Sequence, residues 1–415
     1  MTAAAAAPRG AAPTDLRRAL RRSAGGSRRR AALLVAPLFL FLLVAFLAPI
    51  GSMLWRAVAD PEVGPILPRT IAALDAWDGR AAPTETAYAA LLADLRAARA
   101  AGTLASAATR LNYDVNGFRS LLFSTARRLP ADGAADLTAA FRAIDPRWAD
   151  PETWAAIRRA GGPLTDFYLL AAFDLRRNAD GSIAGTPIEQ AVFRDVLART
   201  LWISLVVTLA CLALGYPAAY LLARLPERTA NMLMILVLVP FWTSLLVRTA
   251  AWVVLLQREG VVNSALIAIG IVDQPLPMIF NRFAVYVAMT HILLPFMILP
   301  LYSVMRGIPE GQMRAAASLG AAPATVFRRI FLPQSMPGVA AGGLLVFIQA
   351  LGYYITPALV GGADDQMISY FIAFYASRTI NWGMAAALSI MLVAATAVLF
   401  VVYRRLAGGG MPRIA

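Results

Sequence analysis

The sequence has no lysine, one cysteine and one histidine in 415 residues. A chain without lysine has no Gly-x-x-x-x-Gly-Lys-Ser/Thr phosphate loop, so the usual ATP-hydrolysing loop is excluded. The single cysteine, Cys211, excludes a disulfide within the chain. With His291 as the single histidine, neither a metal cluster nor a nucleophile–base pair is indicated. The sequence therefore predicts neither an enzyme nor a bound cofactor or metal.

Apolar sequence, by contrast, is abundant. Hydrophobic residues make up 59% of the chain and the mean hydropathy is +0.63, which is too apolar for an ordinary soluble protein. Stretches of about 20 apolar residues are long enough to cross a bilayer as helices. We expect an all-α polytopic membrane protein with six transmembrane helices. They are predicted at about residues 32–57, 197–222, 231–256, 283–305, 338–360 and 382–403.

Charge predicts the orientation of these spans. All 38 basic residues are arginine, and residues 1–30 carry eight of them against one aspartate. The net charge is +3 in 306–336 and +3 in 404–415, whereas it is 0 in 257–282 and −1 in 360–381. The positive-inside rule then places both termini and the loop 306–336 in the cytoplasm. Six spans fit this arrangement, and five or seven do not.

The predicted organisation has five parts. The first apolar run is too long for a signal-peptide core, so we expect it to be retained as a span. The parts are a disordered basic cytoplasmic tail (1–30), the first transmembrane helix (31–57), an extracytoplasmic helical insertion (58–192), a transmembrane core (193–405) and a cytoplasmic tail (406–415).

Two of these parts leave alternatives open. The arginine-rich tail is interpreted as a topology anchor near anionic lipid; a nucleic-acid-binding arm and an organelle transit peptide are the alternatives. The insertion carries 14 arginines and 16 acidic residues and no run long enough to span a membrane. Its segments 84–100 and 134–144 have helical spacing. It is interpreted as a packing or docking element, with a second ligand-binding module as the alternative.

The loop 306–336 has the composition of two short helices joined by a hinge. Ala315, Ala316 and Ala317 form helix well and are small enough for close contact with another surface. Gly320 permits a sharp change of direction, and Pro323 suits the first turn of a second helix.

The second helix is predicted to be short and amphipathic. Phe327, Ile330 and Phe331 recur at helical spacing on one face. We expect Pro333 to end this helix and Pro337 to open the next span.

Residues 314–338 resemble the signature loop of binding-protein-dependent ABC import permeases, in which a Glu-Ala-Ala triplet, a glycine and an Ile-x-Leu-Pro ending recur. Further motifs resemble the spermidine/putrescine branch of that family. They lie at residues 215–224, 246–252, 294–302 and 356–362. The resemblance covers about 195–405 and the first span, and the insertion lies outside it.

The resemblance implies a six-span permease subunit of a type I importer in the bacterial inner membrane, with residues 193–405 as the permease core. Its implied partners are a second permease, identical or not, ATPase subunits that use ATP, and an extracytoplasmic substrate-binding protein; no nucleic acid is implied. Arg314 occupies the usual glutamate position, which puts any carboxylate contact with the ATPase in doubt. The implied coupling residues are Arg314, Ala315, Ala316, Gly320, Ile330, Leu332 and Pro333.

Arg248 is the charged residue that lies furthest inside a predicted span. It is interpreted as part of the translocation pathway or of the permease–permease interface, with snorkelling to the outer surface as the alternative. His291 is interpreted as an interior residue whose hydrogen bonds are satisfied. Aromatic residues offer cation–π surface, although interface belts and packing are the alternatives. The candidate pathway residues are Arg248, Trp252, Trp242, Tyr353 and Tyr354.

The expected cargo is a polyamine such as spermidine or putrescine. A cation prefers carboxylates or aromatic faces, and the predicted spans have no central Asp or Glu. Amino acids, sugars and organic ions remain alternatives within the class; a secondary transporter and a structural scaffold are alternatives outside it. The turn at Gly361, Gly362, Asp364 and Asp365 is either a contact for the binding protein or an ordinary loop.

Overall fold

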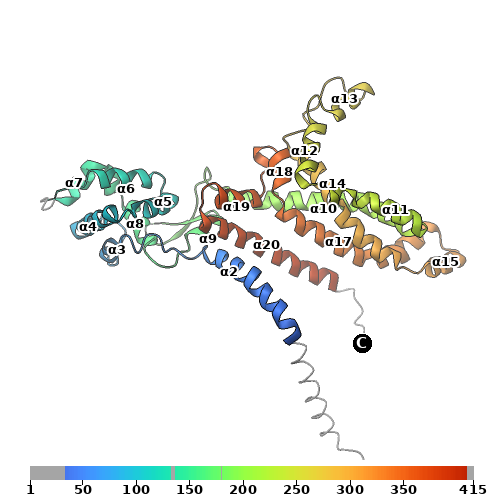
Figure 1. Cartoon of the computed structure of the whole chain (residues 1–415), viewed down its shortest axis with the longest axis horizontal. Helices are drawn as coiled ribbons and strands as arrows, with labels where there is room; N and C mark the ends of the chain where they lie inside the picture. The colour runs from blue at the N-terminus through green and yellow to red at the C-terminus, as the bar shows by residue number, and fades with distance from the viewer. Residues whose placement is uncertain (1–32, 132–135, 179, 409–415) are drawn as a thin grey trace, which may run out of the picture. The chain divides into compact units, whose positions relative to one another are not determined.

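The computed structural model describes residues 33–131, 136–178 and 180–408, and this part of the chain is mostly helical (Figure 1). Five described helices are long and apolar enough to cross a membrane, or six if one bent pair forms a single span. The predicted tail 1–30 and residues 409–415 lie outside the described residues. The long helices are Leu33–Trp55, α10 (Phe193–Arg224), α14 (Arg282–Arg306), Pro323–Gly352 and α20 (Trp382–Gly408).

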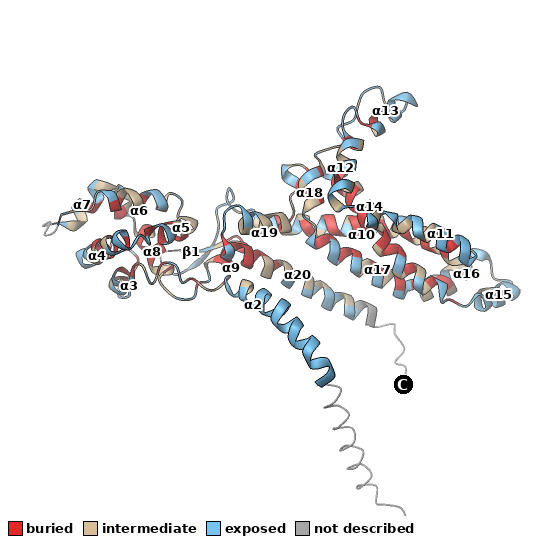
Figure 2. Cartoon of the chain, viewed as in Figure 1, coloured by how far each residue is buried: buried red, intermediate tan, exposed pale blue. Residues whose placement is uncertain are grey.

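The helix Leu33–Trp55 is a unit by itself. It contains a π-helical turn at Leu43–Leu47 and ends with α2 (Ala48–Trp55). Nearly all its side chains are exposed, although they are almost entirely apolar (Figure 2). An apolar surface all round suits a helix surrounded by lipid or by other spans.

The predicted third span, 231–256, is wrong as a single helix. The chain forms α11 (Glu227–Leu238) and a 3₁₀ turn, η3 (Val239–Trp242), and then bends by 94° before α12 (Leu245–Leu256) and α13 (Val261–Ala268). Pro240 opens η3, and Thr243 and Ser244 then take extended backbone conformations that end the helix.

The predicted fifth span, 338–360, is shifted, and Pro333 does not end a helix. One continuous helix runs from Pro323 to Gly352 through α16 (Pro323–Val326), a π turn η4 (Phe327–Phe331) and α17 (Leu332–Gly352). Within the π turn the Leu332 N–H donates to Phe327 O, five residues back, and Pro333 follows in the first turn of α17. The wider turn accommodates a proline that lacks an N–H. After Gly352 the chain is extended at Tyr353 and forms a separate α18 (Ile355–Val360).

Glycines bring the central spans together. Helices α10, α14 and α17 pack on one another around a shared core. A Cβ atom added at Gly342 of α17 would lie 2.9 Å from Met297 Sδ and 3.1 Å from Met297 O of α14. Gly215 of α10 approaches the same methionine. Small residues that allow close backbone approach are the usual means of helix association in membranes.

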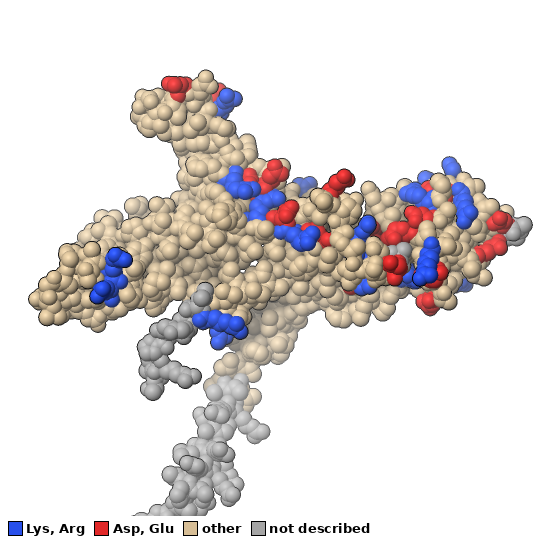
Figure 3. Space-filling model, turned by 180° about the vertical axis from the view of Figure 1, so that it is seen from behind, with Lys and Arg blue, Asp and Glu red and all other residues tan. Residues whose placement is uncertain are grey.

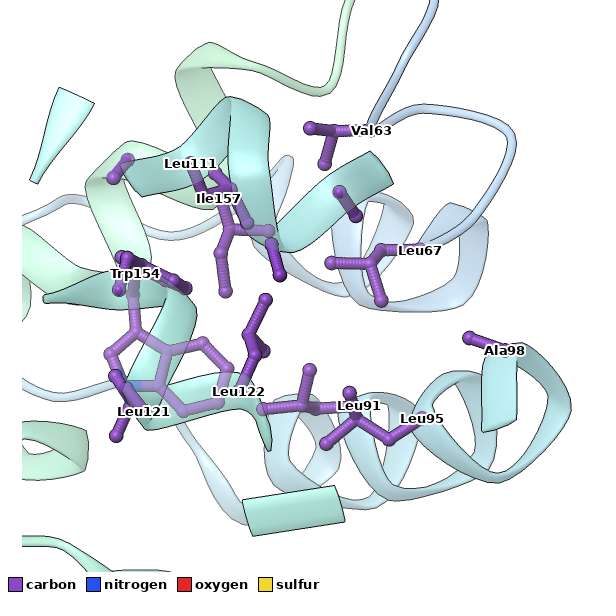
Figure 4. Close-up of a cluster of buried hydrophobic side chains, with 14 of the residues drawn as sticks. Val63, Leu67, Leu91, Leu95, Ala98, Leu111, Leu121, Leu122, Trp154 and Ile157 are labelled. Carbon is purple, nitrogen blue, oxygen red and sulfur yellow. The ribbon is translucent and has the colours of Figure 1, made fainter. Parts of the chain in front are cut away.

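The insertion is a helical domain with its own core. Apolar side chains from α3 to α8 form one buried cluster that includes Trp148 and Trp154. Figure 4 shows part of this cluster, with Trp154, Leu121 and Leu122 labelled. The predicted helix 84–100 corresponds to α4 (Glu85–Ala101). Of the predicted helix 134–144, residues 134 and 135 lie outside the described residues, and the rest corresponds to α7 (Leu137–Ile144). Its helices are α3 (Pro68–Leu74), α4 (Glu85–Ala101), α5 (Leu104–Asp114), α6 (Phe118–Arg127), α7 (Leu137–Ile144), η2 (Pro146–Ala149), α8 (Pro151–Arg159) and α9 (Phe167–Ala172).

A short hairpin corrects the all-α expectation. Strands β1 (Leu175–Arg177) and β2 (Ile183–Gly185) pair antiparallel just before α10. Each strand has three residues. Strands this short leave little periodic signal in a sequence.

The insertion joins the rest of the chain through a neck. Its two ends run side by side, since Asp60 N donates to Pro163 O at 3.0 Å and Thr165 N donates to Val58 O at 2.7 Å. Arg110 of α5 holds the neck, because it pairs with Asp60 and its guanidinium lies 5.0 Å from the centre of the Tyr168 ring. Burial raises the pKa of the Asp60 carboxyl, and Arg110 opposes that rise.

The neck continues into contact with the last helices. Tyr168 packs with residues of α19 (Ile368–Ser377) and α20 in a third buried cluster. A Cβ atom at Gly383 would lie 2.4 Å from Tyr168 Cε2, so this position requires glycine. Charged side chains gather on the insertion, whereas large parts of the visible surface of the transmembrane core carry none (Figure 3).

Candidate functional site

The loop 306–336, called here the signature loop, forms the predicted hinged pair of helices. Helix α15 (Glu310–Ser318) ends at Leu319, and Gly320 turns the chain with a φ of +81°. This left-handed conformation favours glycine. Pro323 occupies the first turn of α16, as predicted. The prediction that the second helix stops at Pro333 is the part of this motif that fails.

The surface of the signature loop is open. Helix α15 has no buried residue, Ala315 is exposed and Ala316 is half-buried. Leu319 is 89% exposed at the tip of the loop. The sequence interpretation missed Leu319; an apolar residue next to a hinge glycine is the signal that could have identified it. An exposed leucine flanked by small residues is suited to contact with another protein.

Arg314 has a partner within α15. It pairs with Glu310 at i, i+4 on the exposed side, and its carbonyl accepts a hydrogen bond from Ser318 Oγ at 3.0 Å. Arg314, which occupies the usual glutamate position, therefore lies beside the carboxylate of Glu310, one helical turn earlier. Sequence reasoning did not single out Glu310.

An aromatic cluster fixes the signature loop to α10. Tyr216 and Tyr220 of α10 pack edge-on against Phe327, and Tyr220 also packs against Phe331 at 5.0 Å between ring centres. The Tyr216 hydroxyl lies 2.9 Å from Ser335 Oγ. These contacts tie the start of the long helix Pro323–Gly352 to the neighbouring span.

Arg224, at the end of α10, completes the attachment. Its guanidinium lies 4.5 Å from the centre of the Tyr220 ring, and Nη2 approaches Met313 Sδ of α15 at 3.1 Å. Of the remaining predicted coupling residues, Ile330 and Leu332 are half-buried and Pro333 is exposed. The predicted coupling residues thus lie on α15, at its hinge and at the start of the long helix Pro323–Gly352, which contacts α10 through the aromatic cluster.

The structure brings three of the five candidate pathway residues together. Arg248 and Trp252 lie on α12, and Arg248 is close enough to Tyr353 and to His291 to interact with both electrostatically. Trp252 Nε1 donates to His291 Nδ1 at 3.2 Å. His291 was interpreted as an interior residue with satisfied hydrogen bonds; it is half-buried and has this partner.

Hydroxyl groups extend this polar cluster. Thr249 Oγ1 of α12 lies 3.1 Å from Thr356 Oγ1 of α18, and Ser369 Oγ donates to Tyr353 O at 2.6 Å. The other two candidates lie apart: Trp242 is 82% exposed before the bend, and the Tyr354 side chain is also exposed.

The turn after α18 is held by an ion pair. Asp365 is buried, its Oδ1 accepts from Arg282 Nε at 2.9 Å, and its Oδ2 accepts from Gly362 N at 3.2 Å. Asp364 is exposed. Among the residues that the structure describes, no group of three or more His, Cys, Asp or Glu side chains is placed to hold a metal ion.

Comparison with known proteins identifies the family. A family model described as "Binding-protein-dependent transport system inner membrane component" matches residues 212–409, which leaves the insertion outside the match. The spermidine/putrescine transport system permease protein PotB of Escherichia coli K12 is 37% identical over 220 residues, which cover 53% of this chain and 80% of PotB. The inner membrane ABC transporter permease protein YdcU of the same organism is 31% identical over 281 residues, which cover 62% of this chain and 87% of YdcU.

Among solved structures, a chain of a bacterial alginate ABC transporter, in complex with an alginate pentasaccharide-bound periplasmic protein, matches with a TM-score of 0.44 and 18% identity. That match covers 52% of this chain and 78% of the other. The similarity to PotB and the family match together place the signature loop and the spans α10 to α20 in one family. The chain belongs to the binding-protein-dependent transport system inner membrane components: it is a permease subunit of an ABC importer, and ATP hydrolysis lies in a separate ATPase subunit.

Proposed function

We propose that this permease subunit imports polyamines such as spermidine and putrescine. The observation that carries the proposal is the 37% identity to PotB, whose name states that cargo, across most of the length of PotB. The aromatic faces of Trp252 and Tyr353 in the polar cluster add surface of the kind that attracts organic cations.

The signature loop is the proposed docking surface for the ATPase subunit. Its tip is apolar and exposed at Leu319, so an ATPase groove can bury it with little change in this chain. The aromatic cluster at Phe327 and Phe331 ties the same loop to α10. Movement of the docked ATPase would therefore be transmitted to the spans and not absorbed by the loop.

The proposed arrangement in the membrane follows from charge. In this arrangement six spans leave both termini and the signature loop in the cytoplasm and the insertion on the opposite side of the inner membrane, as the distribution of arginines favours. There the insertion faces the same compartment as the soluble binding protein that delivers the substrate. A second permease subunit completes the pathway.

A transport experiment tests the cargo. The complete importer with its binding protein is reconstituted in proteoliposomes, and uptake of labelled spermidine is measured with ATP inside. We expect unlabelled spermidine and putrescine to compete, whereas amino acids and sugars do not. ATP-dependent uptake of an amino acid or sugar, with no competition by polyamines, would overturn the polyamine assignment and leave the permease family unaffected.

A further inference from the structure

Arg248 has a buried nitrogen without an acceptor. Its Nε is shielded from solvent and has no hydrogen-bond partner within the described residues. The groups that it reaches electrostatically are His291 and Tyr353, and neither is a carboxylate. A guanidinium in a membrane span without an anion is costly, and charged groups in such positions normally pair with one another or with backbone carbonyls.

The apolar stretches of the spans of this chain have no carboxylate to offer. No Asp or Glu occurs in residues 196–226, 228–258, 274–309 or 311–363. Asp195 and Glu227 lie in the first turns of α10 and α11, and the other acidic residues of the transmembrane core lie outside these helices, for example Glu259 and Asp365, which already pairs with Arg282. No carboxylate in the apolar stretches of the spans can pair with Arg248, which points to an acceptor outside this chain.

The position of Arg248 on α12 indicates where that acceptor approaches. One side of the helix, with Thr249 and Leu256, is buried against the core. Arg248 lies at the border between this buried side and the opposite one. The opposite side is exposed and apolar, and it includes small residues that permit close helix contact. Its residues are Leu246, Val247, Ala250, Ala251 and Val254.

We propose that a carboxylate of the second permease subunit pairs with Arg248 in the assembled importer. Lipid tails cannot supply an anion at this helix face, and a polyamine carries only positive charge. An identical copy of this chain has no carboxylate in the apolar stretches of its spans either, so the proposed carboxylate belongs to a different permease polypeptide.

The pair would have two roles. It would join α12 to the second subunit, and it would neutralise a positive charge that otherwise repels a cationic cargo beside Trp252 and Tyr353. The inference rests on the proposed function in two respects: it assumes a second permease subunit and a positively charged cargo.

The absence of lysine makes a direct test possible. Arg248→Lys introduces the single lysine of the chain, and a membrane-permeant carbodiimide joins an amine to a carboxylate in contact without a spacer. The full importer is treated in membranes, and crosslinked peptides are mapped by mass spectrometry. We expect a crosslink from position 248 to an Asp or Glu in a span of the second permease, which the unsubstituted chain does not form.

A matched variant controls the chemistry. Arg282→Lys places an amine beside Asp365, whose carboxylate lies 2.9 Å from the present arginine, and should crosslink within the chain only. If the Arg282→Lys control forms its crosslink to Asp365 but Arg248→Lys forms no crosslink to the second permease, the inference is overturned. So would a crosslink from position 248 to the binding protein or to this chain itself. Because the readout does not use cargo, failure of polyamine competition would leave it unaffected.

Discussion

Arg110 Nη2 lies 2.6 Å from Asp60 Oδ2, and both side chains are buried, with exposed fractions of 0% and 1%. The two residues are 50 positions apart in the sequence. Asp60 belongs to the neck and Arg110 to α5 inside the insertion, so the pair joins the domain to its attachment. Phe167 and Tyr168 flank the guanidinium at 4.7 and 5.0 Å.

Removing the arginine should destabilise the insertion. Arg110→Met leaves the Asp60 carboxylate buried without its partner, a change that costs about 3–5 kcal/mol for a buried ion pair. The measurement is the protection of the insertion against proteolysis in the purified importer. Arg110→Met with Asp60→Asn should recover a large part of the loss.

The exposed pair of Arg177 and Asp166 provides the matched control. Both side chains are partly open to solvent, so Arg177→Met should cost less than about 1 kcal/mol. Equal sensitivity of Arg110→Met and Arg177→Met would show that the buried pair does not hold the neck.

Close packing of α17 on α14 predicts opposite effects at two adjacent glycines. Gly342→Ala places a methyl group against Met297 and should destabilise by about 1–3 kcal/mol. Gly343 has open space around its Cβ position, so Gly343→Ala should be neutral or stabilise by up to about 1 kcal/mol through helix propensity. Thermal unfolding midpoints in detergent measure both. Identical midpoints for the two variants would contradict the packing argument.

The hinge of the signature loop predicts a coupling defect. Gly320→Val forces a β-branched residue into a φ of +81°, at a cost of about 1–2 kcal/mol. Because no atom lies within 4 Å of its Cβ position, the effect comes from the backbone alone. We expect substrate-stimulated ATPase activity of the reconstituted importer to fall by about fivefold or more if this strain is carried into docking.

Two variants separate the hinge from the loop surface. Gly320→Asn should retain coupling, because asparagine tolerates the left-handed conformation. Gly311→Ala changes a glycine of α15 that has open space and an ordinary φ, and should be neutral. Full coupling in Gly320→Val would remove the hinge from the proposed mechanism.

The exposed tip of the loop predicts a binding defect. Leu319→Asp should abolish co-purification of the ATPase subunit, since a charge replaces the apolar residue that the groove buries. The side chain is 89% exposed, so the fold of this chain should be unaffected. Ile183→Asp, at an exposed apolar residue of β2, is the control and should leave ATPase binding intact.

The hydrophobic runs predicted where most spans lie. They could not predict whether the helix axis changes direction within a span. Averaged hydropathy is the same whether residues 231–256 form one straight helix or two, so the bend at Thr243 and Ser244 left no signal in the hydropathy. Pro240 was the sole local indication, and proline alone is common within spans, as Pro295 and Pro300 in α14 demonstrate. Because helices in membranes tolerate proline, the prediction that Pro333 ends a helix was wrong.

For the candidate site residues, the sequence predicted local backbone geometry where a local motif determines it, and their roles stay predictions. Gly320 and Pro323 could be placed because each acts through its own backbone. Contacts such as Trp252 with His291, 39 positions apart, or Tyr220 with Phe331, depend on how spans pack and have no periodic signature. His291 was interpreted as an interior residue with satisfied hydrogen bonds, and the sequence could not show that its partner would be Trp252, a predicted pathway residue.

The helix from Pro323 to Gly352 is uninterrupted, so under the proposed coupling it would work as a lever. Its 30 residues span about 45 Å at the rise of an α-helix. One end carries the surface proposed for the ATPase, and the other adjoins Tyr353 in the polar cluster. A tilt of about 5° at the first end displaces the second by about 4 Å, which is the width of a methylene chain. A helix stopped at Pro333 would have lost that motion at the joint.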